Sequence, residues 1–196
     1  MNIKTLNYIK IIICCAVMLL LTSVSYVPIE QEINYAETLA YSSKTQHLEE
    51  KAVPAGDTSF KTYMSYKAIT NEQSPQYKLQ QLATTDKNGL RIIDGYYCVA
   101  MGSYYAESIG DKLVIELESG CRINVIIGDF KADKHTDETN RYTDVYDNNG
   151  NFISHNVVEF IVDMSTLDKT AKNWGDISAI EGFEGNIAAI YKIIED

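Results

Sequence analysis

Short apolar runs separated by turn residues dominate the chain after residue 58. Five of these runs are rich in strand-forming residues, and they span 96–101, 112–117, 122–127, 157–162 and 186–194. The second and third runs flank Glu118-Ser119-Gly120-Cys121, which predicts a β-hairpin. The runs do not alternate regularly with helical patterns, so a parallel sheet with crossover helices is not expected.

Helical and loop patterns are fewer. A short helix is predicted from Ser165 to about Lys172, because Ser165 is a capping residue and Asp168 lies in the first turn. Residues 78–84 fit either a strand or a helical turn. Residues 130–156 are almost entirely polar and predict a long loop, and loops of that length are usually functional or mobile. Residues 59–196 therefore predict a mainly β domain, a small closed β-barrel with one short helix.

The first 58 residues have a different pattern. Residues 1–25 contain Lys4 and Lys10, no acid, an apolar run and small residues at the end, which predicts a secretory signal peptide. The alternative is an uncleaved membrane anchor, because residues 9–27 approach the length that spans a bilayer. Residues 26–58 are polar and poorly patterned, and they predict a linker before the β domain. The expected location is secreted or extracytoplasmic.

The composition indicates a globular domain and argues against a nucleic-acid-binding protein. The chain has 196 residues, 45% of them hydrophobic, which is enough for one core. Its formal net charge of −10 argues against nucleic acid as a partner. Removal of a leader that carries two lysines and no acid would take this charge to −12. The 14 tyrosines also favour strands.

Two acidic residues follow the most apolar strands and are the first candidates for chemistry. Asp129 ends Ile126-Ile127-Gly128-Asp129, and Asp163 ends Phe160-Ile161-Val162-Asp163. A carboxyl group at the mouth of an apolar barrel is partly desolvated, which raises its pKa and suits it to general acid catalysis. The alternative is that both residues cap turns at strand ends.

Tyrosines and cysteines supply further candidates. Tyr104 and Tyr105 follow a glycine-serine pair, and their rings are candidates for stacking on sugars, although ordinary surface or core packing is the alternative. Cys98 and Cys121 form a possible disulfide if the domain is exported, or remain two buried free thiols.

The histidines and acids of the polar stretch do not match a standard metal motif. A metal ion held by Asp129, His135 and Asp137 is an alternative to a solvated loop, but the spacing fits neither a zinc nor a calcium site. A nucleophilic pair of Cys98 with His135 or His155 also stays open. No phosphate-binding or dinucleotide motif is present, and we expect no metal and no cofactor.

The order of these segments resembles a known family. Tyr97–Gly102, Ile109–Leu113, Ile127–Asp129 and Phe160–Asp163 resemble, in that order, the double-psi β-barrel called the three-aspartate domain. This domain occurs in membrane-bound lytic transglycosylase A, in rare lipoprotein A-like proteins and in wall-associated proteins of Gram-positive bacteria. The resemblance implies a six-stranded double-psi barrel in residues 59–196. Asp137 or Asp86 is the candidate for the third aspartate.

The same resemblance implies a function. Asp163 would be the general acid/base of a peptidoglycan lytic transglycosylase, Asp129 would tune it, and Asp137 would join Tyr104 and Tyr105 in binding substrate. The partner would be peptidoglycan or another cell-surface glycan, and the protein would be associated with the cell wall or membrane. The alternative is a non-catalytic module that binds glycan or protein at the cell surface.

Overall fold

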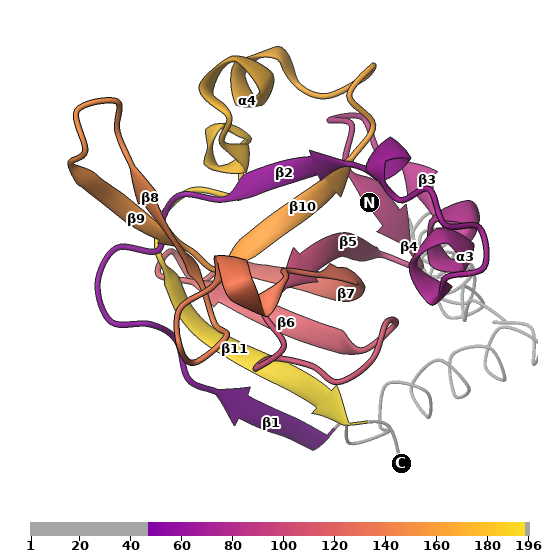
Figure 1. The fold of residues 1–196 in the computed structure, drawn as a ribbon, viewed down its shortest axis with the longest axis horizontal. Coiled ribbons are helices and arrows are strands. Elements are labelled where there is room, and N and C mark those ends of the chain that lie inside the picture. The colour runs from indigo at the N-terminus through magenta and orange to yellow at the C-terminus, as the bar shows by residue number, and fades with distance from the viewer. Residues whose placement is uncertain (1–46, 195–196) are drawn as a thin grey trace, which may run out of the picture. The chain divides into compact units, whose positions relative to one another are not determined.

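The computed structural model describes residues 47–194, which belong to one compact unit (Figure 1). The segments predicted as signal peptide and membrane tether, with most of the predicted linker, lie outside the described residues. The described part is mainly β, as the sequence predicts.

Eleven strands form the frame of the described domain. They are β1 (His47–Lys51), β2 (Thr62–Ser65), β3 (Thr84–Thr85), β4 (Arg91–Ile93), β5 (Tyr96–Met101), β6 (Lys112–Leu117), β7 (Arg122–Phe130), β8 (Thr143–Tyr146), β9 (Phe152–Asn156), β10 (Val158–Val162) and β11 (Ile187–Ile194). The helices are α3 (Pro75–Leu82) and α4 (Lys169–Trp174), and short 3-10 turns span Tyr66–Ala68, Asp133–His135 and Ile177–Ala179.

The main sheet is open, and the prediction of a closed barrel is wrong. Its strand order is β1-β11-β6-β7-β5-β10-β2, with β4 also paired to β5 and β3 paired to β4. The pairs β5–β7 and β2–β10 are parallel, and the other pairs are antiparallel. Among residues 47–194, no pairing joins β1 to β2, because β1 occupies the outer edge of β11.

The β6–β7 hairpin is confirmed, but the boundary of the domain differs from the predicted one. Strand β1 lies in the segment predicted as a linker, and all five of its residues register with β11. Within the described residues, the sheet therefore includes a strand that precedes residue 59. Four of the five residues of β1 are exposed, so the segment lacks the apolar signal of a strand.

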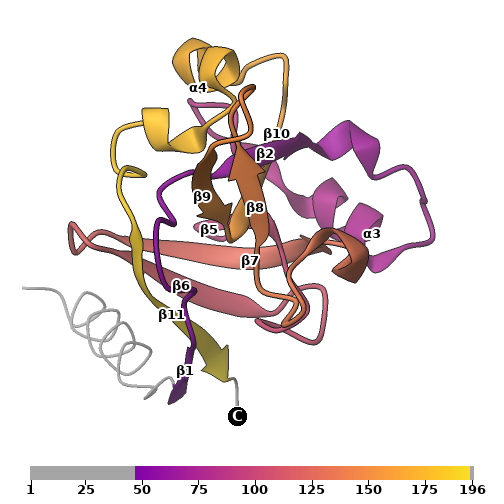
Figure 2. The ribbon, with the colours of Figure 1, turned by 60° about the vertical axis from the view of Figure 1, so that its left-hand side comes forward.

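The long polar stretch is also more ordered than predicted. It contains β8 and β9, which pair as a separate two-stranded hairpin (Figures 1 and 2). At the turn, the Asp147 carboxylate accepts hydrogen bonds from the backbone N–H groups of Asn149 and Asn151, both at 2.8 Å. Local side-chain bonds to the backbone therefore build a turn that hydrophobicity does not reveal.

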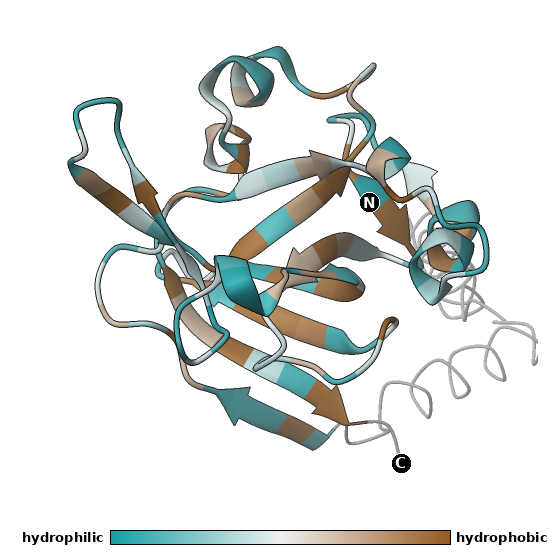
Figure 3. Cartoon of the chain, viewed as in Figure 1, coloured by the Kyte–Doolittle hydropathy of each residue, from teal (hydrophilic) through white to brown (hydrophobic). Residues whose placement is uncertain are grey.

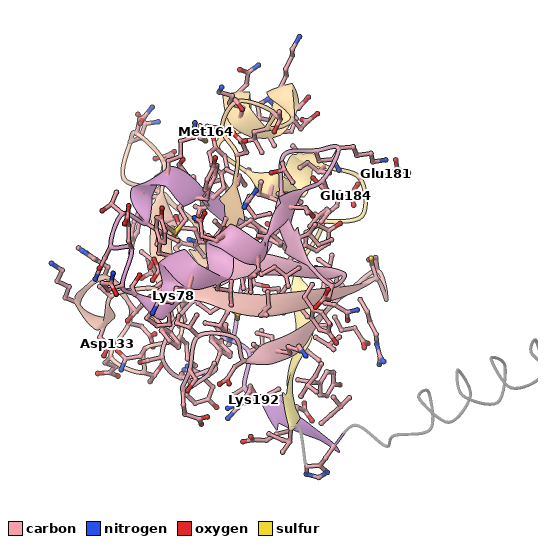
Figure 4. The ribbon with its side chains drawn as sticks, turned by 90° about the vertical axis from the view of Figure 1, so that its right-hand side faces the viewer. Lys78, Asp133, Met164, Glu181, Glu184 and Lys192 are labelled. Carbon is pink, nitrogen blue, oxygen red and sulfur yellow. The ribbon has the colours of Figure 1, made fainter. Side chains whose placement is uncertain are left out.

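Both helices begin at identifiable caps. Ser74 accepts a hydrogen bond from the Tyr77 N–H, and Pro75 occupies the first turn of α3, which covers one face of the sheet (Figure 4). Asp168 caps α4 by accepting from the N–H groups of Thr170 and Ala171. The predicted helix therefore starts at Lys169, a few residues after Ser165.

Alternation along the central strands divides the core in two. Val99 and Met101 of β5 face the main core, whereas Cys98 packs in a second cluster with Ile126 and Ile161. Tyr66, Ile69 and Leu79, from the segment between β2 and the end of α3, pack against this second cluster. The outer face of the sheet is thus partly covered, and Figure 3 shows hydrophobic stretches along the central strands, as burial on both faces requires.

One lysine is fully buried and joins distant segments. Lys61 is 1% exposed, and its ammonium group donates to the carbonyl oxygens of Ser59 at 2.9 Å and Gly185 at 2.7 Å. Burial lowers the pKa of Lys61 to about 8, although the charges of nearby acids, Asp176 first among them, oppose this shift. The hydrogen bonds hold the start of β2 against the segment that leads into β11.

We predict that Lys61→Ala lowers the free energy of unfolding by about 3 kcal/mol, because the Gly185 carbonyl loses the ammonium donor, the Ser59 carbonyl keeps only the Ser178 hydroxyl, and a cavity opens. Urea denaturation measures this loss. The matched control is Lys134→Ala, which removes an exposed lysine and should change stability by less than about 0.5 kcal/mol. Equal stabilities of the two variants would contradict the role given to Lys61.

Candidate functional site

Two carboxylic acids lie on one line of residues that crosses four strands. Asp129 of β7 registers with Ala100 of β5, Ala100 registers with Glu159 of β10, and Glu159 registers with Thr62 of β2. Registered residues on neighbouring strands point to the same face of a sheet. Two strand spacings separate Asp129 from Glu159, about 10 Å between Cα atoms. We call these four residues the acid rung.

A β-bulge brings Asp129 onto this rung. The register between β5 and β7 shifts so that Val99 pairs with Ile127 but Ala100 pairs with Asp129, which leaves Gly128 as the extra residue. A Cβ atom on Gly128 would lie 2.6 Å from the Cδ1 atom of Ile161. A side chain at this position would therefore displace the end of the Ile161 side chain, and the bulge turns Asp129 toward the outer face.

Glu159 has a raised pKa. Burial raises its pKa, and the negative charge of Asp129 adds to this effect, while Lys131 and a hydrogen bond with Thr62 oppose it. The side chains of both acids are half-buried, so solvent reaches the rung. The arrangement therefore places a carboxyl group with raised pKa on the same face of the sheet as a second carboxyl group, two strands away, a combination that suits acid catalysis.

Lys131 completes the electrostatics of the rung. It is 8% exposed, and its Nζ donates to the backbone oxygen of Asn156 at 2.6 Å. Burial lowers its pKa to about 8, and the opposite charge of Glu159 limits this shift. The Asn156 side chain in turn donates to the Thr62 hydroxyl at 2.7 Å. The end of β9 is thereby fixed to the acid rung.

The structure does not bring Asp163 to Asp129. Asp163 follows β10, four residues beyond Glu159, which is about 13 Å along the strand. Its carboxylate accepts from the Ser165 hydroxyl at 2.6 Å and the Ser165 N–H at 2.9 Å, and these bonds lower its pKa. Asp163 thus has the geometry of a turn cap, and a lowered pKa does not suit a general acid.

The two candidate tyrosines have different environments. Tyr105 is fully buried, and its hydroxyl donates to the backbone oxygen of Ala52 at 3.3 Å, so it presents no ring surface to a ligand. Burial raises the pKa of this hydroxyl. Tyr104 is 40% exposed, but Arg141 lies 5.7 Å and Lys51 6.0 Å from its ring centre. The Tyr104 ring is therefore engaged by cationic side chains of the same domain rather than left open to a sugar.

Asp137 organises its own loop. Desolvation alone would raise its pKa, but hydrogen bonds from the Thr139 hydroxyl and from the N–H groups of Arg141, Tyr142 and Thr139 outweigh it and lower the pKa to about 2. The bond from the Arg141 N–H measures 2.7 Å. The carboxylate is thus used within the segment. Among residues 47–194, no group of three or more His, Cys, Asp or Glu residues is arranged to hold a metal ion.

The two cysteines of the described domain are free thiols, and the disulfide does not form. Cys98 registers with Ile126 of β7, whereas Cys121 lies five residues earlier, about 16 Å along that strand. A disulfide needs Cα atoms less than about 7 Å apart. The alternative of two buried thiols holds for Cys98 but not for Cys121, which is exposed at the β6–β7 turn.

Glu159 and Lys131 were missed by the sequence reasoning for different reasons. Glu159 is the single charged residue in the run Val157–Val162, and a charge inside a buried strand is a signal for a special environment. Lys131 carries no such signal, because its burial depends on where β9 ends. A cavity of about 310 Å³ lies beside α3 and is lined by Tyr66, Lys67, Ile69, Thr70, Tyr77, Gln80 and Gln81, not by the two rung acids.

Comparisons with known proteins assign no family to this chain. No family model matches it, and neither a curated protein nor a solved structure does. Within the described range, none of the helices is both long and apolar enough to span a membrane.

The two thiols should differ strongly in reactivity. We predict that iodoacetamide alkylates Cys121 about a hundredfold faster than Cys98 in the native protein, because burial shields Cys98 and raises its pKa to about 11. Peptide mapping by mass spectrometry separates the two sites. Denatured protein, in which both should react, is the control, and similar native rates would contradict this environment for Cys98.

Proposed function

We propose that the chain is an exported cell-surface protein that cleaves glycan strands of the cell wall, with Glu159 as the general acid/base. The observation that carries this proposal is the acid rung, where Glu159 has a raised pKa and Asp129 lies on the same face. A protonated and an ionised carboxyl group in one site are the usual requirements for breaking a glycosidic bond.

Each acid has a distinct role in the proposed reaction. Glu159 protonates the glycosidic oxygen as the bond to the anomeric carbon breaks, and the Asp129 carboxylate stabilises the positive charge that develops on the sugar. The 6-hydroxyl group of the same sugar then attacks the anomeric carbon and returns a proton to Glu159. The product is a 1,6-anhydro sugar, as the resemblance to lytic transglycosylases implies.

Peptidoglycan is the proposed substrate, since the resemblance to the three-aspartate domain, the signal-like residues 1–25 and the tether-like residues 9–27 all favour the cell surface. We propose, on the same resemblance, that the open sheet is related to a double-psi β-barrel. The alternative function is a non-catalytic module that holds glycan or protein on the same face. It is favoured by the cavity beside α3, which offers two tyrosines and two glutamines but no acid.

We predict that Glu159→Gln reduces release of 1,6-anhydro-muropeptides from purified sacculi by about 10²- to 10⁴-fold, because the amide cannot donate the proton. Chromatography with mass spectrometry measures the product. Asp163→Asn is the matched control and should retain activity, since Asp163 caps a turn. Loss of activity only in Asp163→Asn would return the acid role to Asp163, and binding to sacculi without product would favour the binding module.

The pH dependence offers a second test of Glu159. Its carboxyl group must be protonated to act, so activity is lost as pH rises through its raised pKa, and this alkaline limb should lie above pH 4.5, the ordinary pKa of a glutamate. Rates of product release across pH measure the limb. An alkaline limb at or below pH 4.5 would contradict a desolvated acid.

A further inference from the structure

The β8–β9 hairpin carries an unusual concentration of exposed apolar side chains. Tyr146 is 55% exposed, Phe152 46% and Ile153 43%, and the hairpin projects from the domain (Figure 1). Figure 3 shows the apolar residues on the outer part of β9. Exposed side chains of this size that gather on one projecting element usually mark a contact site.

The rings on this hairpin form a continuous row. Tyr146 registers with Phe152, and their ring centres lie 6.1 Å apart. Phe152 lies 4.8 Å from His155, and His155 lies 4.2 Å from Tyr142. Exposure decreases from the two outer rings to the two inner ones, which are half-buried. We call these four residues the aromatic row.

The inner end of the row is held rigidly. The Nδ1 atom of His155 lies 2.7 Å from an Asp144 carboxylate oxygen, which fixes the ring plane. The next residue, Asn156, bonds to Lys131 and Thr62 and so ties the row to the acid rung. The inner end of the row is therefore joined to the acid rung through one buried residue.

Charge decides which ligand fits. Residues 143–156 contain Asp144 and Asp147 but no lysine or arginine, so the row is unsuited to nucleic acid or another polyanion. Aromatic rings beside asparagine and carboxylate groups suit sugar rings, which offer apolar C–H faces and hydroxyl donors.

We propose that the aromatic row binds an uncharged chain of N-acetylated hexosamines and presents it to the acid rung. The inference rests on the proposed function for its choice of glycan, but it adds a binding site outside the reacting groups. Tyr146 and Phe152 supply the accessible rings, and His155 supplies a fixed inner ring. The row should therefore strengthen the binding of long glycan chains and add little to the binding of the shortest ones.

The test measures binding of a β-1,4-linked N-acetylglucosamine hexamer to the full chain by isothermal titration calorimetry, in a Glu159→Gln background so that cleavage does not interfere. The double variant Tyr146→Ala/Phe152→Ala should bind at least about tenfold more weakly. Its melting temperature should fall by only a few degrees, because both side chains are about half exposed and lose mainly their contact with each other and with His155. The matched control is Trp174→Ala, which removes a 69% exposed ring from α4 and should leave binding unchanged.

Several outcomes would overturn the inference: equal binding by the double variant, an equal loss in Trp174→Ala, or a single-stranded oligonucleotide that binds the row more tightly than the hexamer. The result also separates this inference from the proposed catalysis. If the hexamer binds through the aromatic row but the protein releases no product, the proposed catalysis is wrong and the binding site stands. If the double variant binds the hexamer normally and, with Glu159 intact, releases product from sacculi at the normal rate, the catalysis stands and the binding site is wrong.

Discussion

The pairing of β5 is the constraint on which the rest of the domain depends. This strand is parallel to β7 on one side and antiparallel to β10 on the other, and Cys98 to Met101 are at most 1% exposed. A strand buried on both faces leaves its neighbours no freedom of register, because a slip by one residue would reverse every side chain. The position of the acid rung follows directly from this register.

The bulge at Gly128 shows how packing and chemistry are coupled. If the strand kept Gly128 but ran on without a bulge, Asp129 would alternate toward the main core, where Ile127 already packs. With it, the carboxyl group reaches the outer face beside Glu159, and the absence of a side chain at Gly128 makes room for Ile161 and Gln80. The positive charge of Lys131 opposes the repulsion between the two acids, and the backbone oxygen of Asn156 accepts a hydrogen bond from its buried ammonium group.

The same contacts connect the acid rung to the projecting hairpin. Asn156 ends β9, and its backbone and side chain bond to Lys131 and Thr62 at the same time. A hairpin attached in this way cannot rotate freely relative to the sheet, since that motion would leave a buried ammonium group without an acceptor. Ser154 and His155 add further bonds to residues 57–60, so several residues of β9 fix the hairpin to the sheet.

Much of the strand pattern was available from the sequence. The apolar runs that became β5, β6, β7, β10 and β11 were identified because buried strands need apolar side chains whatever their partners. Strands β1, β8 and β9 were missed because their residues are mostly exposed or polar, and their pairing depends on β11, on the Asp147 turn and on contacts with residues 57–62. The sequence predicts Asp129 as a candidate, but it pairs this residue with Asp163, whereas the register aligns it with Glu159.

By itself, the sequence determined a mainly β domain and an acid at the end of β7. Only the tertiary structure decided that the sheet stays open, that Glu159 rather than Asp163 lies beside Asp129, and that Cys98 and Cys121 lie far apart. The physical reason is that burial and alternation are local properties of a strand, whereas register, bulges and desolvation arise only when strands distant in the chain pack together.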